Sequence, residues 1–227
     1  MKTAGVIGGF GPQTTAKFYE EVFFACQRLN SVVKPHILIS SVPLPFWIEE
    51  TALLKNEGVE DYLPYLTKEA QRLEKAGADF IVMPCNSLHV HIDALCASVQ
   101  LPVLSILEET AQFLVQQNIH RIGILSTAIT ASHFLYKNAL AKYGIECLHP
   151  KQDQQEFLNA IVLRLVNGIT DNHDREVLHA IMQTLTGVDC ILLACTDLQL
   201  VELHYPTLPI FDTLQILVNS TVRELLA

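Results

Sequence analysis

The sequence predicts an α/β fold made of two similar lobes, each containing a parallel sheet flanked by helices. Short apolar strands alternate with amphipathic helices along the chain, and one half of the chain resembles the other. With 227 residues, the chain is about 1.5 times as long as an average domain, so one large domain or two small ones fit. Half of the residues are hydrophobic and 17% are charged, a composition that supplies a packed core and argues against disorder.

The predicted strands are short apolar runs that lack a regular alternation of polar and apolar residues. They cover Thr3–Ile7, His36–Val42, Phe80–Met83, Val103–Leu104, Arg121–Leu125, Cys190–Leu193 and Ile210–Phe211. Strands of this kind are buried on both faces, as in a parallel sheet that lies between two layers of helices.

The predicted helices lie between these strands and show apolar residues at a spacing of three to four. Their apolar faces are Tyr19, Val22, Phe23, Cys26 and Leu29; Leu63, Leu66, Ala70 and Leu73; Leu158, Ile161, Val162 and Leu165; Leu178, Ile181, Met182 and Leu185; and Leu214, Leu217, Val218, Thr221, Val222 and Leu225. Strands and helices that alternate with short connections predict right-handed crossovers between parallel strands.

An internal repeat supports the division into two lobes. The segment around Cys85 (Gly77 to His89) aligns with the segment around Cys195 (Gly187 to Gln199), at an offset of 195 − 85 = 110 residues. Two further matches follow the same order: Leu101-Pro-Val-Leu recurs as Leu208-Pro-Ile-Phe, and Ala4-Gly-Val-Ile is echoed by Ile122-Gly-Ile-Leu. Together they predict a duplicated lobe, and the absence of a Pro-, Gly- or Ser-rich linker predicts close packing of the halves.

Charge and hydropathy argue against several classes of partner. The chain carries 24 acidic and 15 basic residues, a formal net charge of −9, and has no basic run, so neither a nucleic acid nor a membrane is predicted as a partner. No stretch approaches the roughly 18 consecutive apolar residues of a membrane span. The start of the chain is interpreted as a buried strand and not as a signal peptide, which predicts a cytoplasmic location.

The six cysteines do not form a metal or disulfide pattern. They contain no C-x-x-C pair and no zinc-finger spacing, so no metal site is predicted. In a cytoplasmic protein a disulfide framework is not expected either. Cys26, Cys96, Cys147 and Cys190 are interpreted as packing residues, because free cysteine commonly acts as a small hydrophobic side chain.

Cys85 and Cys195 are predicted to be functional. Each ends a buried strand, and each is followed by polar residues, Asn86 and Ser87 in one case and Thr196 and Asp197 in the other. Ligands of parallel α/β sheets bind at the carboxyl ends of the strands, where the following helix N-terminus favours a thiolate. Two such thiols across one cleft could remove a proton from one face of a carbon and deliver a proton to the other.

The motifs around these cysteines resemble those of the aspartate/glutamate racemase family, cofactor-independent amino-acid racemases related to hydantoin racemases and maleate isomerases. The resemblance runs from end to end, and its most diagnostic feature is the pair Cys-Asn-Ser and Cys-Thr-Asp about 110 residues apart. The matching segments are Gly8-Gly-Phe-Gly-Pro-Gln-Thr-Thr15, Met83-Pro-Cys-Asn-Ser-Leu-His89, Leu125-Ser-Thr-Ala-Ile-Thr130, Ala194-Cys-Thr-Asp-Leu198 and Pro209-Ile-Phe-Asp-Thr213.

The resemblance implies two Rossmann-like lobes, residues 1–105 with 212–227 and residues 106–211, with the active site in the cleft between them. It implies an amino-acid substrate, no cofactor and a homodimer. One cysteine, as thiolate, would abstract the α-proton, and the other, as thiol, would protonate the carbanion from the opposite face.

The resemblance also implies roles for the polar residues beside the cysteines. Asn86, Ser87 and Thr196, with their backbone N–H groups, would hold the substrate α-carboxylate. The glycine loop, with Gly9 and Gly11, would close one wall of the site and add contacts to the substrate. Thr127 and Thr130 would add further contacts. The glycine loop is only part of a dinucleotide fingerprint and lacks the lysine of a P-loop, so a tight turn before a helix explains it better than a nucleotide site. His89 could orient the site, whereas Glu109 is interpreted as a solvated helix residue.

The chain departs from the family pattern in ways that bear on its substrate. Ser87 stands where threonine is usual, Ala194 replaces glycine and Asp197 replaces glutamate. The arginine and lysine that typically accompany aspartate recognition are not evident, and Trp47 and Glu156 occupy those segments instead. A pocket lined by Trp47 and Glu156 would favour a neutral, polar or basic side chain. Alternatives that remain open are hydantoin racemisation, maleate isomerisation and a non-catalytic amino-acid-binding module.

Overall fold

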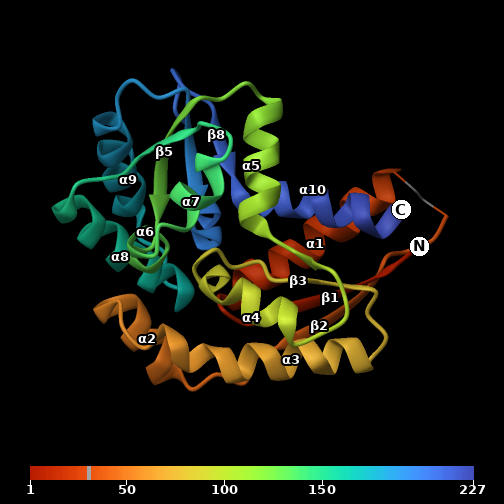
Figure 1. Cartoon of the computed structure of the whole chain (residues 1–227). Coiled ribbons are helices and arrows are strands. Elements are labelled where there is room, and N and C mark those ends of the chain that lie inside the picture. The colour runs from red at the N-terminus through yellow and green to blue at the C-terminus, as the bar shows by residue number, and fades with distance from the viewer. Residues whose placement is uncertain (30–31) are drawn as a thin grey trace.

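The computed structural model describes residues 1–29 and 32–227, and its two parallel sheets have the same strand order (Figure 1). The first sheet has the order β2-β1-β3-β4 and the second has the order β6-β5-β7-β8. The strands are β1 (Thr3–Gly8), β2 (His36–Ser41), β3 (Phe80–Val82), β4 (Val103–Leu104), β5 (Arg121–Ser126), β6 (Glu146–Leu148), β7 (Cys190–Ala194) and β8 (Ile210–Asp212). All the pairings between them are parallel, which confirms the predicted α/β class.

Strand β6 is the strand that the sequence does not reveal. It consists of Glu146, Cys147 and Leu148, which are exposed or half-buried at the edge of the second sheet. Because β6 has only three residues and one of them is charged, the sequence contains no apolar run there that would indicate a strand.

Helices surround both sheets. They are α1 (Pro12–Leu29), α2 (Phe46–Lys55), α3 (Leu63–Lys75), α4 (Ile92–Ala97), α5 (Ile106–Gln116), α6 (Ala128–Ser132), α7 (Leu135–Ala141), α8 (Gln152–Val166), α9 (Asn172–Thr184) and α10 (Thr213–Leu226). Short 3-10 turns are η1 (Val59–Tyr62), η2 (Ser87–His91) and η3 (Thr196–Leu200). The predicted apolar faces of α8, α9 and α10 are buried throughout, as expected.

The apolar face of α1 is rotated relative to the prediction. Its buried residues are Thr14, Phe18, Val22, Ala25 and Cys26. The prediction was wrong for Tyr19 and Leu29, which are 40% and 70% exposed. The side chains of Tyr19 and Phe23 contact each other on the outer side of this helix. These aromatic residues extended the apolar pattern in the sequence, although they do not belong to the core.

One hydrophobic cluster joins the two sheets. It contains Val6 and Phe80 from the first sheet, Ile124 and Leu192 from the second, and residues of α1, α5 and α10. The outer face of each sheet has a separate cluster, with α2, α3 and α4 on the first sheet and α8 and α9 on the second. The lobes therefore share a core, and the boundaries predicted for them stay a prediction.

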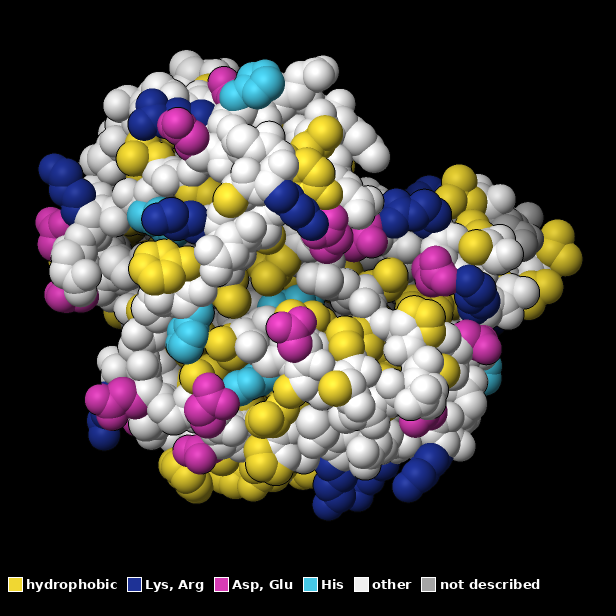
Figure 2. All heavy atoms as spheres, in the orientation of Figure 1, with side chains coloured by type: hydrophobic (Ala, Val, Ile, Leu, Met, Phe, Trp, Pro, Cys, Tyr) yellow, Lys and Arg dark blue, Asp and Glu magenta, His cyan; other side chains and the backbone are white. Residues whose placement is uncertain are grey.

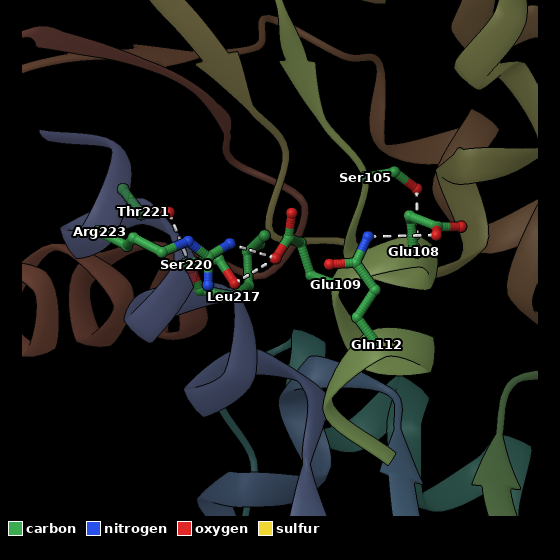
Figure 3. Close-up of polar contacts among 8 residues, drawn as sticks. All are labelled: Ser105, Glu108, Glu109, Gln112, Leu217, Ser220, Thr221 and Arg223. Carbon is green, nitrogen blue, oxygen red and sulfur yellow. Dashed lines mark hydrogen bonds and ion pairs between the residues drawn. The ribbon is translucent and has the colours of Figure 1, made fainter. Parts of the chain in front are cut away.

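Helix α10 follows the second sheet in the chain and packs against both α1 and α5. At the contact with α5, Glu109 accepts hydrogen bonds from Ser220 Oγ (2.6 Å) and from an Arg223 guanidinium nitrogen (2.7 Å) (Figure 3). The Glu109 side chain is only 13% exposed. The interpretation of Glu109 as a solvated helix residue was therefore wrong, because α10 covers that side of α5.

The two donors to Glu109 are expected to differ in their contribution to stability. Ser220 is buried, so Ser220→Ala should lower the free energy of unfolding by about 1.5–3 kcal/mol, the range for a hydrogen bond to a charged group. The Arg223 side chain is 65% exposed, and Arg223→Ala should cost under about 1 kcal/mol because solvent screens the ion pair. Urea denaturation of both variants measures the difference in the free energy of unfolding. Equal decreases in the two variants would contradict a larger contribution from the buried Ser220.

The surface on the side shown in Figure 2 carries Lys and Arg side chains that are scattered and interspersed with acidic ones. Within residues 1–29 and 32–227, no helix combines the length and the apolar character that a membrane crossing requires.

Candidate active site

Cys85 and Cys195 line the same pocket, and each lies just beyond the carboxyl end of a strand, one in each sheet. Cys85 follows β3 and Cys195 follows β7, and these strands hold equivalent places in the two sheet orders. The pocket has about 470 Å³ of empty space, part of it open to solvent. Its lining comes from both lobes: Phe10, Glu49, Leu53, Tyr62, Cys85, Asn86, Ser87, Leu88, Thr127, Ile129, Val162, Val166, Cys195, Thr196 and Asp197.

Both thiols are held in environments that favour the protonated form. Burial raises the pKa of Cys85 to about 12, with further increases from the negative charges of Asp197 and Glu49. Burial, followed by the charge of Asp197, raises the pKa of Cys195 well above its ordinary value. Backbone N–H groups at the start of η2 and η3 oppose these effects, because they donate toward the sulfur atoms. A substrate that supplies positive charge would shift the balance further toward a thiolate.

Asp197 lies between Cys195 and the glycine loop. Cys195 Sγ is 4.0 Å from Asp197 Oδ2, within the range for a hydrogen bond from sulfur, and Thr14 Oγ1 donates to Asp197 Oδ1 at 2.6 Å. Burial raises the pKa of Asp197 to about 6 despite the hydrogen bond from Thr14. A carboxylate at this position can accept the Cys195 proton or stabilise the thiol.

The glycine loop packs directly against Asp197. Gly11 has φ = +104°, and a Cβ built there would lie 2.5 Å from Asp197 Oδ1. Gly9, with φ = +98°, lies against the residues that end and follow β2, where a Cβ would meet Ser41 Oγ and Val42 N, each at 3.0 Å. These two glycines shape the wall, and Phe10 between them provides the side chain that lines the pocket.

Three predicted binding residues form a hydroxyl cluster across the two lobes. Ser87 Oγ lies 2.7 Å from Thr127 Oγ1 and 3.3 Å from Thr130 Oγ1, and the two threonine oxygens are 3.2 Å apart. Thr127 also caps helix α6, where it accepts a hydrogen bond from the Thr130 N–H group. Ser87 and Thr127 line the pocket, with Thr130 behind them.

Asn86 and Thr196 connect the lobes beside the cysteines. The Asn86 amide accepts a hydrogen bond from Tyr136 Oη (2.6 Å) and donates one to Thr213 Oγ1 (3.0 Å), and all three residues are buried. Thr196 Oγ1 donates to the carbonyl oxygen of Pro84 at 3.2 Å. The Asn86 side chain is thus held by residues of both lobes.

His89 fixes the backbone at Cys85. Its Nε2 accepts a hydrogen bond from Ile106 N–H (3.1 Å), so its Nδ1 is the nitrogen that donates to the Cys85 carbonyl oxygen (2.8 Å). Burial lowers the pKa of His89 to about 4, so the ring is neutral at physiological pH. His89 therefore holds the Cys85 backbone against the start of α5, in agreement with an orienting role.

Trp47 and Glu156 do not line the pocket, contrary to the expectation from their segments. Both are exposed, Trp47 by 59%. Their helices contribute other residues, Glu49 and Leu53 from α2 and Val162 and Val166 from α8. Helical residues turn by about 100° per position, so Trp47 and Glu49, two positions apart, point to opposite sides of α2. Glu49 and Leu53 are four positions apart, as are Val162 and Val166, and this spacing indicates that each pair shares one face of its helix. The sequence does not indicate which face of the helix meets the pocket.

The lining contains no Lys, Arg or His among the described residues, and two acidic side chains, Glu49 and Asp197, are present. In residues 1–29 and 32–227, no group of three or more His, Cys, Asp or Glu side chains is placed to hold a metal ion. Of the cysteines interpreted as packing residues, Cys26 and Cys190 are buried and Cys147 is half-buried. Cys96 is exposed on α4, so that interpretation was wrong for it.

Comparisons with known proteins find racemases that are similar to this chain over nearly its whole length. Residues 7–221 match the family model described as Asp/Glu/Hydantoin racemase. The chain is 31% identical over 229 residues to the broad specificity amino-acid racemase RacX of Bacillus subtilis (strain 168), with 98% of each chain covered.

Solved structures of similar proteins share the fold over the whole chain. A candidate Asp/Glu racemase from Yersinia pestis superposes with a TM-score of 0.85 at 29% identity, and both chains are covered completely. An aspartate racemase homologue from Pyrococcus horikoshii OT3 superposes with a TM-score of 0.79 at 24% identity, also with complete coverage of both chains.

Proposed function

This chain belongs to the Asp/Glu/hydantoin racemase family, and we propose that it interconverts the two enantiomers of an amino acid without a cofactor. The observation that carries the proposal is the pair of cysteines that end equivalent strands and line one pocket. A near-symmetric pair of acid/base groups suits a reaction in which substrate and product are mirror images with equal free energy.

In the proposed reaction the two thiols exchange roles. The thiolate of one cysteine removes the α-proton, and the electron pair of the broken C–H bond passes to the carbanion. The thiol of the other cysteine then donates its proton to the opposite face of the same carbon. The first cysteine ends as a thiol and the second as a thiolate, which is the arrangement needed for the reverse direction.

Polar groups around the thiols would stabilise the bound substrate. The hydroxyl groups of Ser87 and Thr127 and the backbone N–H groups at Asn86 and Thr196 are proposed to hold the α-carboxylate and to meet the charge that develops on it. The substrate ammonium would be attracted by Asp197, which is buried beside Cys195. That positive charge would lower the pKa of the nearby thiols and assist formation of the thiolate.

The lining supports a substrate with a neutral or basic side chain. With acidic groups and no cation on the described walls, a second carboxylate on the substrate would meet repulsion. The similarity to a racemase described as having broad specificity supports a substrate range beyond aspartate and glutamate. A homodimer and a cytoplasmic location stay predictions.

Solvent deuterium exchange tests the proposal. Incubation of the protein in D₂O with a panel of L-amino acids should produce the D-enantiomer together with deuterium at Cα, measured by NMR and chiral chromatography. We expect the highest rates with neutral or basic side chains. Aspartate or glutamate as the best substrate would contradict the substrate proposal. If none of the amino acids in the panel exchanges its α-proton, the racemase proposal is removed. Assays with hydantoins and with maleate test the related reactions.

A further inference from the structure

We propose that Glu49 selects substrates with a cationic side chain, because it places an unpaired carboxylate at the end of an apolar wall of the pocket. The inference rests on the proposed racemase function and names the substrate class within it. It identifies one specificity-determining residue that neither the family motifs nor the paired cysteines indicate.

The position of Glu49 fits a side-chain subsite. Glu49 lies on α2, which belongs to the first lobe and packs against α8 of the second (Figure 1). Its carboxylate is near enough to Cys85 and Asp197 to affect the pKa of one and be affected by the other. It faces the reacting groups from a different element of the chain, where a substrate side chain would extend away from the two thiols.

The Glu49 carboxylate lacks a partner in the part of the chain that the structure describes. No hydrogen bond or ion pair to it is present there, whereas Asp197 accepts a hydrogen bond from Thr14. Burial, together with the charge of Asp197, raises the pKa of Glu49 to about 7. An acidic group held in a pocket without a compensating cation is costly to the free protein. A cation supplied by the ligand would remove that cost, which is the usual signature of a recognition group.

The apolar residues next to Glu49 complete the match. Leu53 lies one helical turn further along α2, and Val162 and Val166 form the facing wall on α8. A side chain with a methylene stem and a positive tip can lie along such a wall and bring its charge to the carboxylate. Lysine and ornithine have this shape. An acidic substrate would instead bring a further negative charge toward Glu49 and Asp197.

Norleucine provides the decisive comparison, because it has the same carbon stem as lysine and no side-chain ammonium. We expect the wild-type enzyme to have a kcat/KM for L-lysine about tenfold or more above that for L-norleucine, the factor that about 1.4 kcal/mol of charge pairing provides. Glu49→Gln should remove most of this preference through a higher KM for lysine that norleucine does not share. Loss of the Glu49 charge also removes one of the effects that raise the pKa of Cys85, and the resulting change in kcat should be the same for both substrates.

Glu50→Gln is the matched control. Glu50 is the next residue of α2, is exposed and lies outside the pocket lining, so its substitution should leave both substrates unchanged. Glu49→Lys should reverse the charge selection, with loss of lysine racemisation and a gain with aspartate or glutamate.

The outcomes separate this inference from the proposed function. Equal losses with lysine and norleucine in Glu49→Gln would overturn the inference, because Glu49 would then bind the α-ammonium group common to both. Unchanged kinetics with both would overturn it as well. Racemisation in either case leaves the proposed function intact, whereas a wild-type protein inactive on every amino acid removes that function.

Discussion

Replacement of Cys85 or Cys195 with serine is expected to reduce racemisation in both directions by about 10²–10⁴-fold, the range attributed to a positioned acid or base. The serine hydroxyl is a far weaker acid than the thiol, so Cys85→Ser leaves no group able to exchange protons on that face of the α-carbon. Because the two cysteines act on opposite faces, each variant blocks both directions of the reaction even though one thiol is intact.

Deuterium exchange gives a sharper signature than the loss of activity. Each single variant should still exchange the α-proton of one enantiomer with solvent through its remaining cysteine, without inversion, and the two variants should retain opposite enantiomers. Cys96→Ser is the control, because Cys96 is exposed on α4 and lies outside the pocket lining. Substantial two-way racemisation by either site variant would contradict the two-thiol reaction.

Gly11→Ala is expected to lower the free energy of unfolding by about 3 kcal/mol or more and to reduce activity strongly. The substitution adds a side chain at φ = +104°, a strained conformation for any residue with a Cβ, and strain of this kind costs about 1–3 kcal/mol. The new Cβ would also lie 2.5 Å from Asp197 Oδ1, so the Asp197 carboxylate must shift, which disturbs its hydrogen bond from Thr14 and its position beside Cys195.

Gly77→Ala separates the two causes. Gly77 has φ = +92°, and a Cβ there meets nothing within 4 Å, so this variant carries the backbone strain without the collision. We expect Gly77→Ala to cost about 1–3 kcal/mol and to leave kcat/KM unchanged. Chemical denaturation and racemisation assays of both variants measure the difference. A Gly11→Ala variant that matches Gly77→Ala in stability and retains activity would show that the glycine loop does not hold Asp197.

The sequence predicted the parts of the molecule that follow local patterns. The repeat identified Cys85 and Cys195 because each ends an apolar run and is followed by polar residues, and the structure places both in one pocket. The helical faces of α8, α9 and α10 followed from their spacing. Strand β6 could not be predicted in this way, because a three-residue edge strand is stabilised by its neighbour and not by its own composition.

Contacts between the lobes were outside the reach of local patterns. Periodicity places Glu49 and Trp47 on the same helix, but only the packing of α2 against α8 decides that Glu49 meets the pocket. Glu109 illustrates the same limit, since its partners Ser220 and Arg223 lie more than 100 positions away along the chain. The hydrogen bonds of Asn86 likewise depend on Tyr136 and Thr213, which no spacing connects to it.

The core shared by the two sheets has a consequence for the order in which the chain can fold. Helix α10, from the end of the chain, packs against α1 and closes next to β1, where Lys2 N–H donates to the carbonyl oxygen of Leu225 at 3.0 Å. During synthesis the N-terminal sheet emerges before the second sheet, and the core that it shares with α1 and α5 is complete only once α10 has packed against both helices. Contacts of such long sequence separation slow folding and prolong the exposure of apolar surface. The two sheets therefore share a core whose completion depends on α10.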